Sequence, residues 1–289
     1  MELTDQQRQF LAAIRLSRLP GVGAAKFAEL VNRFGSPLAA LAEELRQGEL
    51  FVSPDKAPLG SAEAHVEEYF RDGGEGVFFG AEDYPRLLRR IPEPPPYLFR
   101  RGPLWPLDPF AAAIVGTRDA TNAGRAFAFE LARSLSALGV TVISGGATGI
   151  DTSAHRGALA HGGPTVLVTA TGIDRHYPPA SEPLYREIER KGCLLTELLP
   201  GTPPRRDFFP TRNRIIAGLS RALVVIEGRQ RSGTASSVVH MRKLKRPIFV
   251  WTGADRNRFD LPDDVLSRGG LALDGPDADA VVRVMLAQA

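Results

Sequence analysis

Several classes of protein are excluded by what this sequence of 289 residues lacks. It has one cysteine, Cys193, so no disulfide can form within the chain. No apolar run approaches the roughly 18 residues that a membrane-spanning helix needs. The first ten residues, MELTDQQRQF, contain no apolar segment typical of a secretory signal. We therefore expect a cytoplasmic protein without membrane contact, in which Cys193 is a buried thiol.

Motifs for common cofactors, metals and catalytic groups are also missing. Residues 145–149 read GGATG, which does not match the dinucleotide pattern G-x-G-x-x-G, and there is no G-x-x-x-x-G-K-[ST] phosphate loop. A G-x-S-x-G nucleophile motif is absent too. The histidines show no metal-ligand spacing: His65, His155, His161, His176 and His240. We expect no cofactor, no metal and no catalytic residue, and we expect His155 to serve packing or hydrogen bonding.

Residues 1–75 are predicted to form a small all-α domain. Apolar residues recur at helical spacing in four segments, with Ser36 as an N-cap before Pro37. These segments are 5–19, 24–34, 36–45 and 61–74. The glycine-containing LPGVG at 19–23 separates the first two. This pattern predicts four or five short helices.

Residues 76–275 predict a doubly wound, mostly parallel sheet. A proline-rich stretch at 91–109 reads as a stiff extended connection, with YLF as an edge strand. Short apolar runs then alternate with helical segments, which is typical of an α/β fold. The runs are 111–115, 140–144, 165–169, 193–197, 222–227 and 247–251. Residues 276–289 predict one terminal helix.

Three loops that follow these apolar runs are rich in glycine. They supply Gly116, Thr117 and Arg118; Ser144, Gly145 and Gly146; and Gly233 with Thr234. Glycine lets backbone N–H groups approach an anion, and the following helix N-terminus adds a positive dipole end. Parallel strands end at one edge of the sheet, so we expect the loops to form one phosphate-binding pocket. Each loop read alone also fits a simple tight turn.

Positive charge is concentrated in one stretch. The net charge is only +3, but residues 205–246 hold eleven Lys and Arg against two acids. Phe208 and Phe209 lie between arginines, and cations beside ring faces suit single-stranded nucleic acid. Pro210 predicts a loop, after which Arg212 and Asn213 open a helix. Solvated helix faces are the alternative interpretation, above all for RKLKR at 242–246.

These motifs together resemble the DNA-processing protein A family (DprA, also called Smf). The resemblance covers about residues 83–252. Its markers are DYPRLLRRIPEPPPYLFRRG, IVGTR, SGGATGIDTSAH, TGIDRHYP, LLTE, FFPTRNRIIAGLS, VVIEGRQRSGTAS and RPIFV, in that order. The resemblance implies an extended Rossmann-like fold, preceded here by a SAM-like or helix-hairpin-helix domain. It also implies a homodimer that binds single-stranded DNA without known catalysis, protects incoming DNA in natural transformation, and helps load RecA recombinase onto it.

The resemblance also assigns roles to single residues. Arg118 matches a phosphate contact, Gly145 and Gly146 a glycine turn, and Phe209 a base-stacking aromatic. The remaining matches are Arg206, Arg212, Asn213, and one of Lys243, Lys245 and Arg246. The sequence departs from the family at SGTASSV, where S-G-S-L-x-T-A is usual, and at Thr252-Gly253. The winged-helix-like domain that many members carry at the C-terminus is not expected here.

Two rival functions remain open. RSGTASS resembles part of the signature of Lonely-guy nucleotide phosphoribohydrolases, but no glutamate follows it. Such an enzyme needs a carboxylate near the ribose. Asp151 and Glu197 are the candidates, although a helix-entry acid and a hydrogen-bonded buried acid are the simpler interpretations. The other rival is a protein adaptor whose basic stretch faces an acidic partner. The LPGVGAAK hairpin can contact duplex DNA or only pack.

Overall fold

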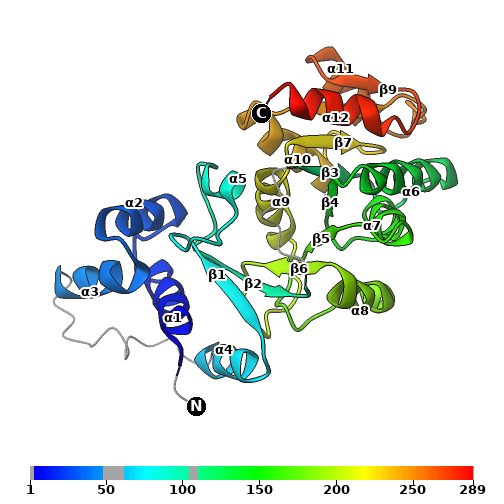
Figure 1. Cartoon of the computed structure of the whole chain (residues 1–289). Helices are drawn as coiled ribbons and strands as arrows, with labels where there is room; N and C mark the ends of the chain where they lie inside the picture. Colours follow the sequence, from blue (N-terminus) through cyan, green and yellow to red (C-terminus); the bar gives the residue numbers. More distant parts are fainter. Residues whose placement is uncertain (1–2, 48–61, 104–109, 289) are drawn as a thin grey trace.

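The computed structural model describes residues 3–47, 62–103 and 110–288. Its centre is a nine-stranded sheet with the strand order β1-β2-β6-β5-β4-β3-β7-β8-β9 (Figure 1). The pairs from β6 to β9 are parallel, whereas β1 and β2 are antiparallel. The strands are β1 (Glu75–Phe78), β2 (Tyr97–Arg101), β3 (Ala111–Val115), β4 (Thr141–Ser144), β5 (Thr165–Val168), β6 (Cys193–Thr196), β7 (Ala222–Val225), β8 (Ile248–Trp251) and β9 (Leu271–Leu273).

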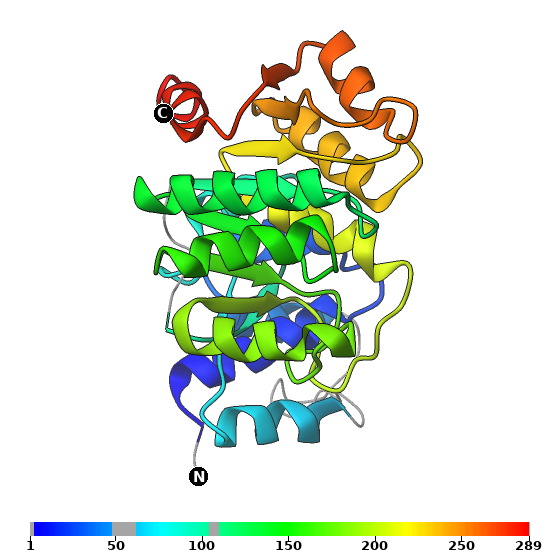
Figure 2. The same cartoon turned by 90° about the vertical axis from the view of Figure 1, so that its right-hand side faces the viewer.

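Helices cover both faces of the sheet. On one face α6 (Asn122–Ala137), α7 (Ile150–Ala160) and α8 (Glu182–Lys191) lie one above another, as Figure 2 shows. On the other face α9 (Phe208–Leu219) packs on β3, β4 and β5, and α10 (Gly233–Lys243) packs on β7 and β8. The remaining elements of this part are α5 (Arg86–Arg89), the 3₁₀ turn η2 (Pro179–Ser181), α11 (Leu261–Ser267) and α12 (Ala278–Leu286).

The predicted doubly wound sheet is confirmed, and its six predicted runs all form strands. The prediction that YLF forms an edge strand is wrong, because β2 pairs with β6 on one side and with β1 on the other. The strands β1 and β9, which have four and three residues, were not predicted. The apolar run of β9, LAL, is too short to be distinguished from a loop, and its first two residues are exposed.

Four helices precede the sheet within the described residues: α1 (Asp5–Ser17), α2 (Ala24–Phe34), α3 (Pro37–Gln47) and α4 (Ala62–Arg71). Their ends follow local rules. Thr4 caps α1 by accepting a hydrogen bond from the Gln7 amide, and α2 ends at Gly35 in the left-handed region (φ 83°). Ser36 accepts from the Ala39 amide at 3.2 Å, which confirms the predicted N-cap of α3.

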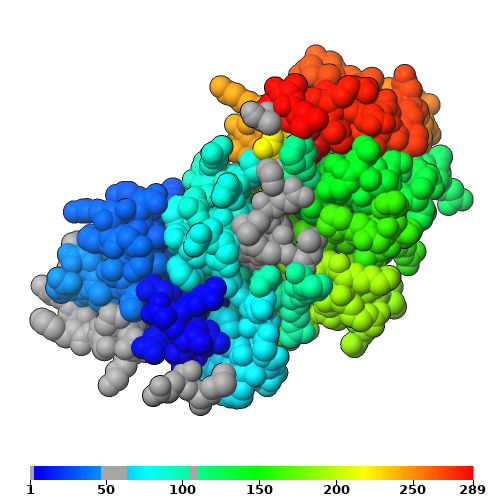
Figure 3. Space-filling model, in the orientation of Figure 1, coloured from blue at the N-terminus to red at the C-terminus, as the bar shows by residue number. Residues whose placement is uncertain are grey.

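The N-terminal helices share an apolar cluster with the sheet. The Phe10 ring in α1 lies edge-on to Phe99 of β2, with ring centroids 5.0 Å apart, and to Phe70 of α4 at 5.2 Å. In Figure 3 the blue N-terminal helices abut the cyan segment that holds β1 and α5. The division into 1–75 and 76–275 stays a prediction. No helix in the described ranges is long and apolar enough to cross a membrane.

Candidate nucleic-acid interface

Four loops meet at the carboxyl edge of the parallel strands. From β3 the chain runs outward through β4, β5 and β6, and it returns through α9 to β7 on the other side of β3. Such a reversal creates a crevice at the strand ends, which is the usual ligand position in open α/β sheets. The loops after β3, β4, β5 and β7 surround two adjoining cavities here.

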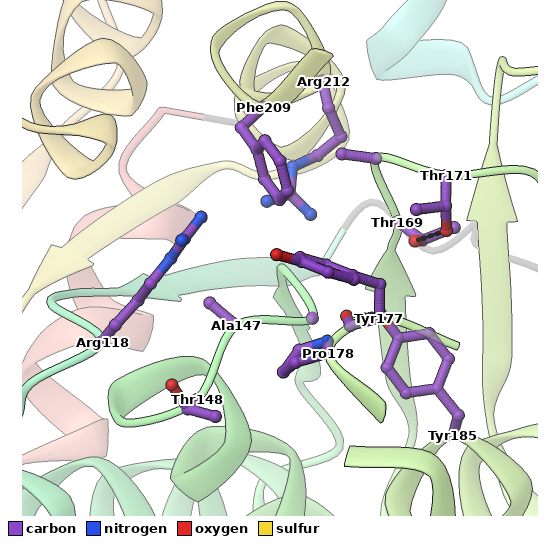
Figure 4. A pocket seen from close by; sticks show the side chains of 12 residues that line it. Arg118, Ala147, Thr148, Thr169, Thr171, Tyr177, Pro178, Tyr185, Phe209 and Arg212 are labelled. Atoms are coloured by element: carbon purple, nitrogen blue, oxygen red, sulfur yellow. Dashed lines mark hydrogen bonds between the residues drawn. The ribbon is translucent and has the colours of Figure 1, made fainter. Parts of the chain in front are cut away.

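The two cavities differ in size and lining. The large cavity has a volume of about 300 Å³ and is lined by Gly116, Thr117, Asp151, Asn213, Gly233 and Thr234, among others. The small cavity has a volume of about 130 Å³ and is lined by Gly146, Thr148, Thr169, Thr171, Tyr177 and Tyr185, among others (Figure 4). The residues that line both are Arg118, Ala147, Phe209 and Arg212. The loop after β3 and the start of α9 therefore form the boundary between the cavities.

Helix α9 begins earlier than the sequence predicts. The loop predicted at Pro210 is wrong, because Phe208, Phe209 and Pro210 form the first turn of the helix. Proline is tolerated there because the first helical N–H groups have no partner within the helix. Phe209 and Arg212 are thus three residues apart on one helix, a spacing that brings side chains to the same face. Both line the two cavities.

Phe209 lies between a cation and a second ring. The guanidinium carbon of Arg118 is 5.0 Å from the centroid of the Phe209 ring. The Tyr177 ring is 6.0 Å from it, at an interplanar angle of 55°. Figure 4 shows Arg118 and Tyr177 reaching toward Phe209 from different loops. Arg118 itself is exposed at the rim, where it can contact a ligand.

Arg212 is a buried cation at the base of the site. It donates hydrogen bonds to the Val168 carbonyl and to Asn213 Oδ1, the latter at 3.0 Å. Burial lowers the pKa of Arg212, and the nearby Asp151 carboxylate opposes that effect. Arginine remains protonated in proteins, so the positive charge persists. Burial also raises the pKa of Asp151 to about 6, although Arg212 acts in the opposite direction.

Asn213 fixes the start of α10 beside the large cavity. Its side-chain amide donates to the Gly233 carbonyl at 2.9 Å and to Ser236 Oγ at 2.7 Å. The preceding Ser232 hydroxyl donates to the Arg229 carbonyl at 2.6 Å rather than capping the helix. The first N–H groups of α10 therefore border the large cavity without a cap from Ser232, an arrangement that favours an anion.

The glycine turn after β4 has an inner and an outer part. Ser144 is fully buried, where its hydroxyl donates to the Ile114 carbonyl at 2.6 Å. Gly145 is buried too, and its carbonyl accepts a hydrogen bond from His155 Nε2 at 2.9 Å. Gly146 lines the small cavity, and a Cβ there would overlap the Tyr185 hydroxyl. Of these three predicted residues, Gly146 alone lines one of the two cavities, although it is buried as well.

The structure places the other predicted cations away from the two cavities. Arg206 is exposed just before α9, outside both cavity linings. Lys243, at the far end of α10, lines a third cavity together with Arg214 and His240. Lys245 is exposed. Arg246 donates to the carbonyls of Ala217, Gly218 and Ser220 at the end of α9.

Comparison with known proteins settles the family. The profile of the DNA recombination-mediator protein A family matches residues 75–270, and that of the DprA-like N-terminal HHH domain matches residues 7–45.

The chain belongs to the DNA recombination-mediator protein A family.

Curated relatives include Protein Smf of Synechocystis, which is 40% identical over 171 residues, or 58% of this chain and 43% of the relative. A putative DNA processing protein DprA of Mycobacterium tuberculosis is 37% identical over 256 residues, which are 82% of this chain and 65% of the relative. The chain thus matches less than two thirds of the length of these relatives. The solved DprA of Streptococcus pneumoniae superposes with a TM-score of 0.76 at 26% identity, covering 97% of this chain and 98% of that one. The solved DprA of Helicobacter pylori, which is described as binding single-stranded DNA, superposes with a TM-score of 0.65 at 28% identity. That match covers 70% of this chain and 94% of the other.

Family membership confirms the predicted resemblance and its fold. Several single-residue interpretations are also confirmed. His155 forms hydrogen bonds in the core, and Cys193 is a buried thiol. Asp151 lies in the first turn of α7, as predicted for a helix-entry acid. Glu197 accepts hydrogen bonds from the Arg214 guanidinium, but its side chain is 17% exposed, so the predicted burial is not confirmed.

The loop after β5 was not predicted as part of the site. It supplies Thr169, Thr171 and Tyr177 to the small cavity, and Thr148 comes from the glycine turn. A signal was present, because TGIDRHYP follows an apolar run just as the three glycine loops do. This loop contains one glycine at its start rather than a cluster, so glycine density does not mark it, and Tyr177 was not predicted as a ring at the site.

Proposed function

We propose that the two cavities form a site for single-stranded DNA. The observation that carries this proposal is the contact between the Arg118 guanidinium and the Phe209 ring, 5.0 Å apart, on the boundary between the cavities. A cation for phosphate and a ring face for a base are the two groups that such binding needs. The buried charge of Arg212 and the start of α10 add further attraction for phosphate.

Single strands rather than duplex DNA suit this arrangement. Bases in a duplex are stacked on one another, so their faces are not available to Phe209 or Tyr177. Both rings line the small cavity, where an unpaired base could reach them. The description of the Helicobacter relative as binding single-stranded DNA supports the same choice.

We further propose that binding protects incoming DNA in natural transformation and helps to load RecA recombinase, with the protein acting as a homodimer in the cytoplasm. The family's description as a recombination mediator supports this proposal. So do the relatives from Streptococcus pneumoniae and Bacillus subtilis, which are named DNA processing proteins. No cofactor, metal or catalytic step is needed for these roles.

One observation favours the rival enzyme. Asp151 lines the large cavity, and burial raises its pKa to about 6, as suits a general acid. However, the Asp151 carboxylate lies beside a buried cation. Both groups adjoin Gly145, where an added Cβ would lie 2.5 Å from Asp151 Oδ2 and 2.6 Å from an Arg212 nitrogen. Balancing a buried charge explains Asp151 without catalysis. Release of free base from a nucleoside monophosphate would support the enzyme instead.

The proposal is tested by the affinity of the full chain for fluorescent oligo-dT across a salt series. Arg118→Ala and Phe209→Ala should each weaken binding by about tenfold, since a stacked base is worth roughly 1–3 kcal/mol. Arg118→Ala should also flatten the salt dependence, because one phosphate contact is lost. Arg190→Ala is the matched control, because Arg190 is exposed on α8 near the start of β6, at the opposite edge of the sheet. Unchanged binding in both test variants would refute the site.

A further inference from the structure

Glu227 is a buried carboxylate in the loop that follows β7. Only 1% of its surface is exposed. Within the residues that the structure describes, no Lys, Arg or His forms an ion pair with it. Burying a charge without a cation is costly unless hydrogen bonds replace the lost water. For Glu227 these hydrogen bonds come from the loop that carries Arg118.

The Glu227 carboxylate occupies the N-terminus of α6. Its Oε2 accepts a hydrogen bond from the Thr121 amide at 2.8 Å, and its Oε1 accepts one from the Thr121 hydroxyl at 2.5 Å. The carboxylate packs so closely on the first turn that a Cβ at Gly124 would lie 2.5 Å from the carboxyl carbon. The positive end of the helix dipole stabilises a negative charge at this place. The start of α6 is therefore filled by an anion of the protein itself.

The main chain of Glu227 holds the other side of the same loop. Its carbonyl accepts a hydrogen bond from the Thr117 amide at 2.7 Å. Glu227 thus contacts the loop 116–121 on both sides of Arg118, at Thr117 just before it and at Thr121 after it. A loop that is fixed in advance loses less conformational entropy when it binds a ligand than a loop that must first become ordered.

Arg118 is the residue that this loop presents to a ligand. Its side chain is exposed, with the guanidinium carbon 5.0 Å from the centroid of the Phe209 ring. We infer that Glu227 is a positioning residue for Arg118, which fixes the loop 116–121 so that the guanidinium faces the bound strand. This inference rests on the proposed DNA-binding function of the site.

The test compares Glu227→Ala with Glu227→Gln in the full chain, with fluorescent oligo-dT as the ligand. Alanine removes both acceptor atoms and should weaken binding by about fivefold. Glutamine keeps an acceptor for the Thr121 amide and should bind within about twofold of the unchanged protein. A carboxylate that acted only through its charge would repel phosphate, so both variants would then bind more tightly.

Thr121 offers a second pair of variants, which keep the carboxylate and decide the question if Glu227→Ala does not fold. Thr121→Val removes the hydroxyl that donates to Glu227 and should weaken binding by about threefold. Thr121→Ser keeps a hydroxyl at the same position and should retain the affinity.

Two readouts separate positioning from a general loss of stability. In the background of Arg118→Ala, either Glu227→Ala or Thr121→Val should cost less than about twofold in affinity, because the cation that the loop presents is gone. Each variant alone should also flatten the salt dependence of binding, as Arg118→Ala does.

Asp277→Ala is the matched control. The Asp277 carboxylate accepts from the Ala280 amide at 2.8 Å at the start of α12, so its loss also removes a carboxylate from a helix N-terminus. Asp277 lines neither of the two cavities. This variant should leave both the affinity and its salt dependence unchanged.

Unchanged or tighter binding in Glu227→Ala and Thr121→Val would overturn the inference, and so would a loss that persists in full in the background of Arg118→Ala. If Arg118→Ala and Phe209→Ala still weaken dT binding in those cases, the DNA site stands and only the role of Glu227 falls. If Arg118→Ala and Phe209→Ala have no effect on dT binding, the proposed function itself fails.

Discussion

The two ends of the basic stretch 205–246 are equally rich in cations but are used differently. At the first end, α9 directs Arg212 into the cavities, where it meets Arg118 from another loop. At the second end, the Arg246 guanidinium donates to three backbone carbonyls at the end of α9, at 2.6–2.9 Å. Charge density along a sequence therefore does not identify the cations that are available to a ligand.

The reason for the difference is the element that each cation faces. A helix C-terminus presents unpaired carbonyl groups and the negative end of its dipole, both of which attract a cation. Arg246 fills that place for α9, and burial lowers its pKa to about 10. Arg118 follows a strand at the rim of a cavity and stays exposed. The first cation stabilises the fold, while the second is available to a ligand.

The largest expected effect comes from removing Arg246, the cation that stabilises the fold. Arg246→Ala should lower the free energy of unfolding by about 2–3 kcal/mol, because three carbonyls at a helix end lose a charged donor. Denaturant unfolding measures this loss. The affinity for oligo-dT, measured where the variant is still folded, should stay within about twofold of the unchanged protein. If Arg246→Ala lost as much affinity as Arg118→Ala and no stability, the claim that Arg246 stabilises the fold rather than binding DNA would be contradicted.

A smaller effect is expected within the second end itself. Lys243 lines the cavity that also contains Arg214 and His240, whereas Lys245 lies beyond the end of α10 at φ 54°. If the bound strand extends past the two main cavities, Lys243→Ala should weaken binding of a long oligo-dT by about threefold, and Lys245→Ala by less. Competition titrations with long and short strands measure both. A larger loss of affinity for Lys245→Ala than for Lys243→Ala would show that the bound strand does not pass the cavity at Lys243.

The smallest effect concerns pH. The pKa of Asp151 is raised to about 6 by burial, so the carboxylate is charged at pH 8 and mostly protonated at pH 5. Its negative charge opposes phosphate, and affinity for oligo-dT should therefore rise by about two- to threefold as the pH falls across that window. The buried groups beside Asp151 do not titrate in that window, because arginine remains protonated in proteins and burial lowers the pKa of His155 to about 4.

Asp151→Asn is the variant that isolates this effect. It removes the charge and keeps an oxygen that can accept from the Ala147 amide, which lies 3.4 Å from Asp151 Oδ2. Its affinity at pH 8 should match that of the unchanged protein at pH 5, and its pH dependence should be flat. A slope that persists in Asp151→Asn would assign the effect to another group.

The sequence was sufficient for the features that depend on local patterns. Buried parallel strands are continuous apolar runs, and helix starts have recognisable caps, so the sheet and the N-cap at Ser36 were predictable. The glycine loops were predictable as a group, because strand ends share one edge of a parallel sheet. Phe209 was predicted as a ring at the site, although its helical turn was not.

What could not be predicted depends on contacts between distant segments. The packing of Phe10 on β2 joins the N-terminal helices to the sheet across about ninety residues of chain. The capping role of Arg246 needs the position of the end of α9. The burial of Ser144 needs the neighbouring strand β3, to whose Ile114 carbonyl it donates. No periodicity within a segment encodes such contacts.

The central claim is that the main DNA contacts are made by the loops around Phe209 and not by the cations at 242–246. Photo-crosslinking of a short oligonucleotide that carries 5-iodo-deoxyuridine, followed by peptide mapping, tests it directly. We predict that the crosslinks map to the peptides that contain Tyr177 or Phe209, and that Arg118→Ala reduces their yield. Crosslinks confined to residues 242–246, with none at either ring, would contradict the account.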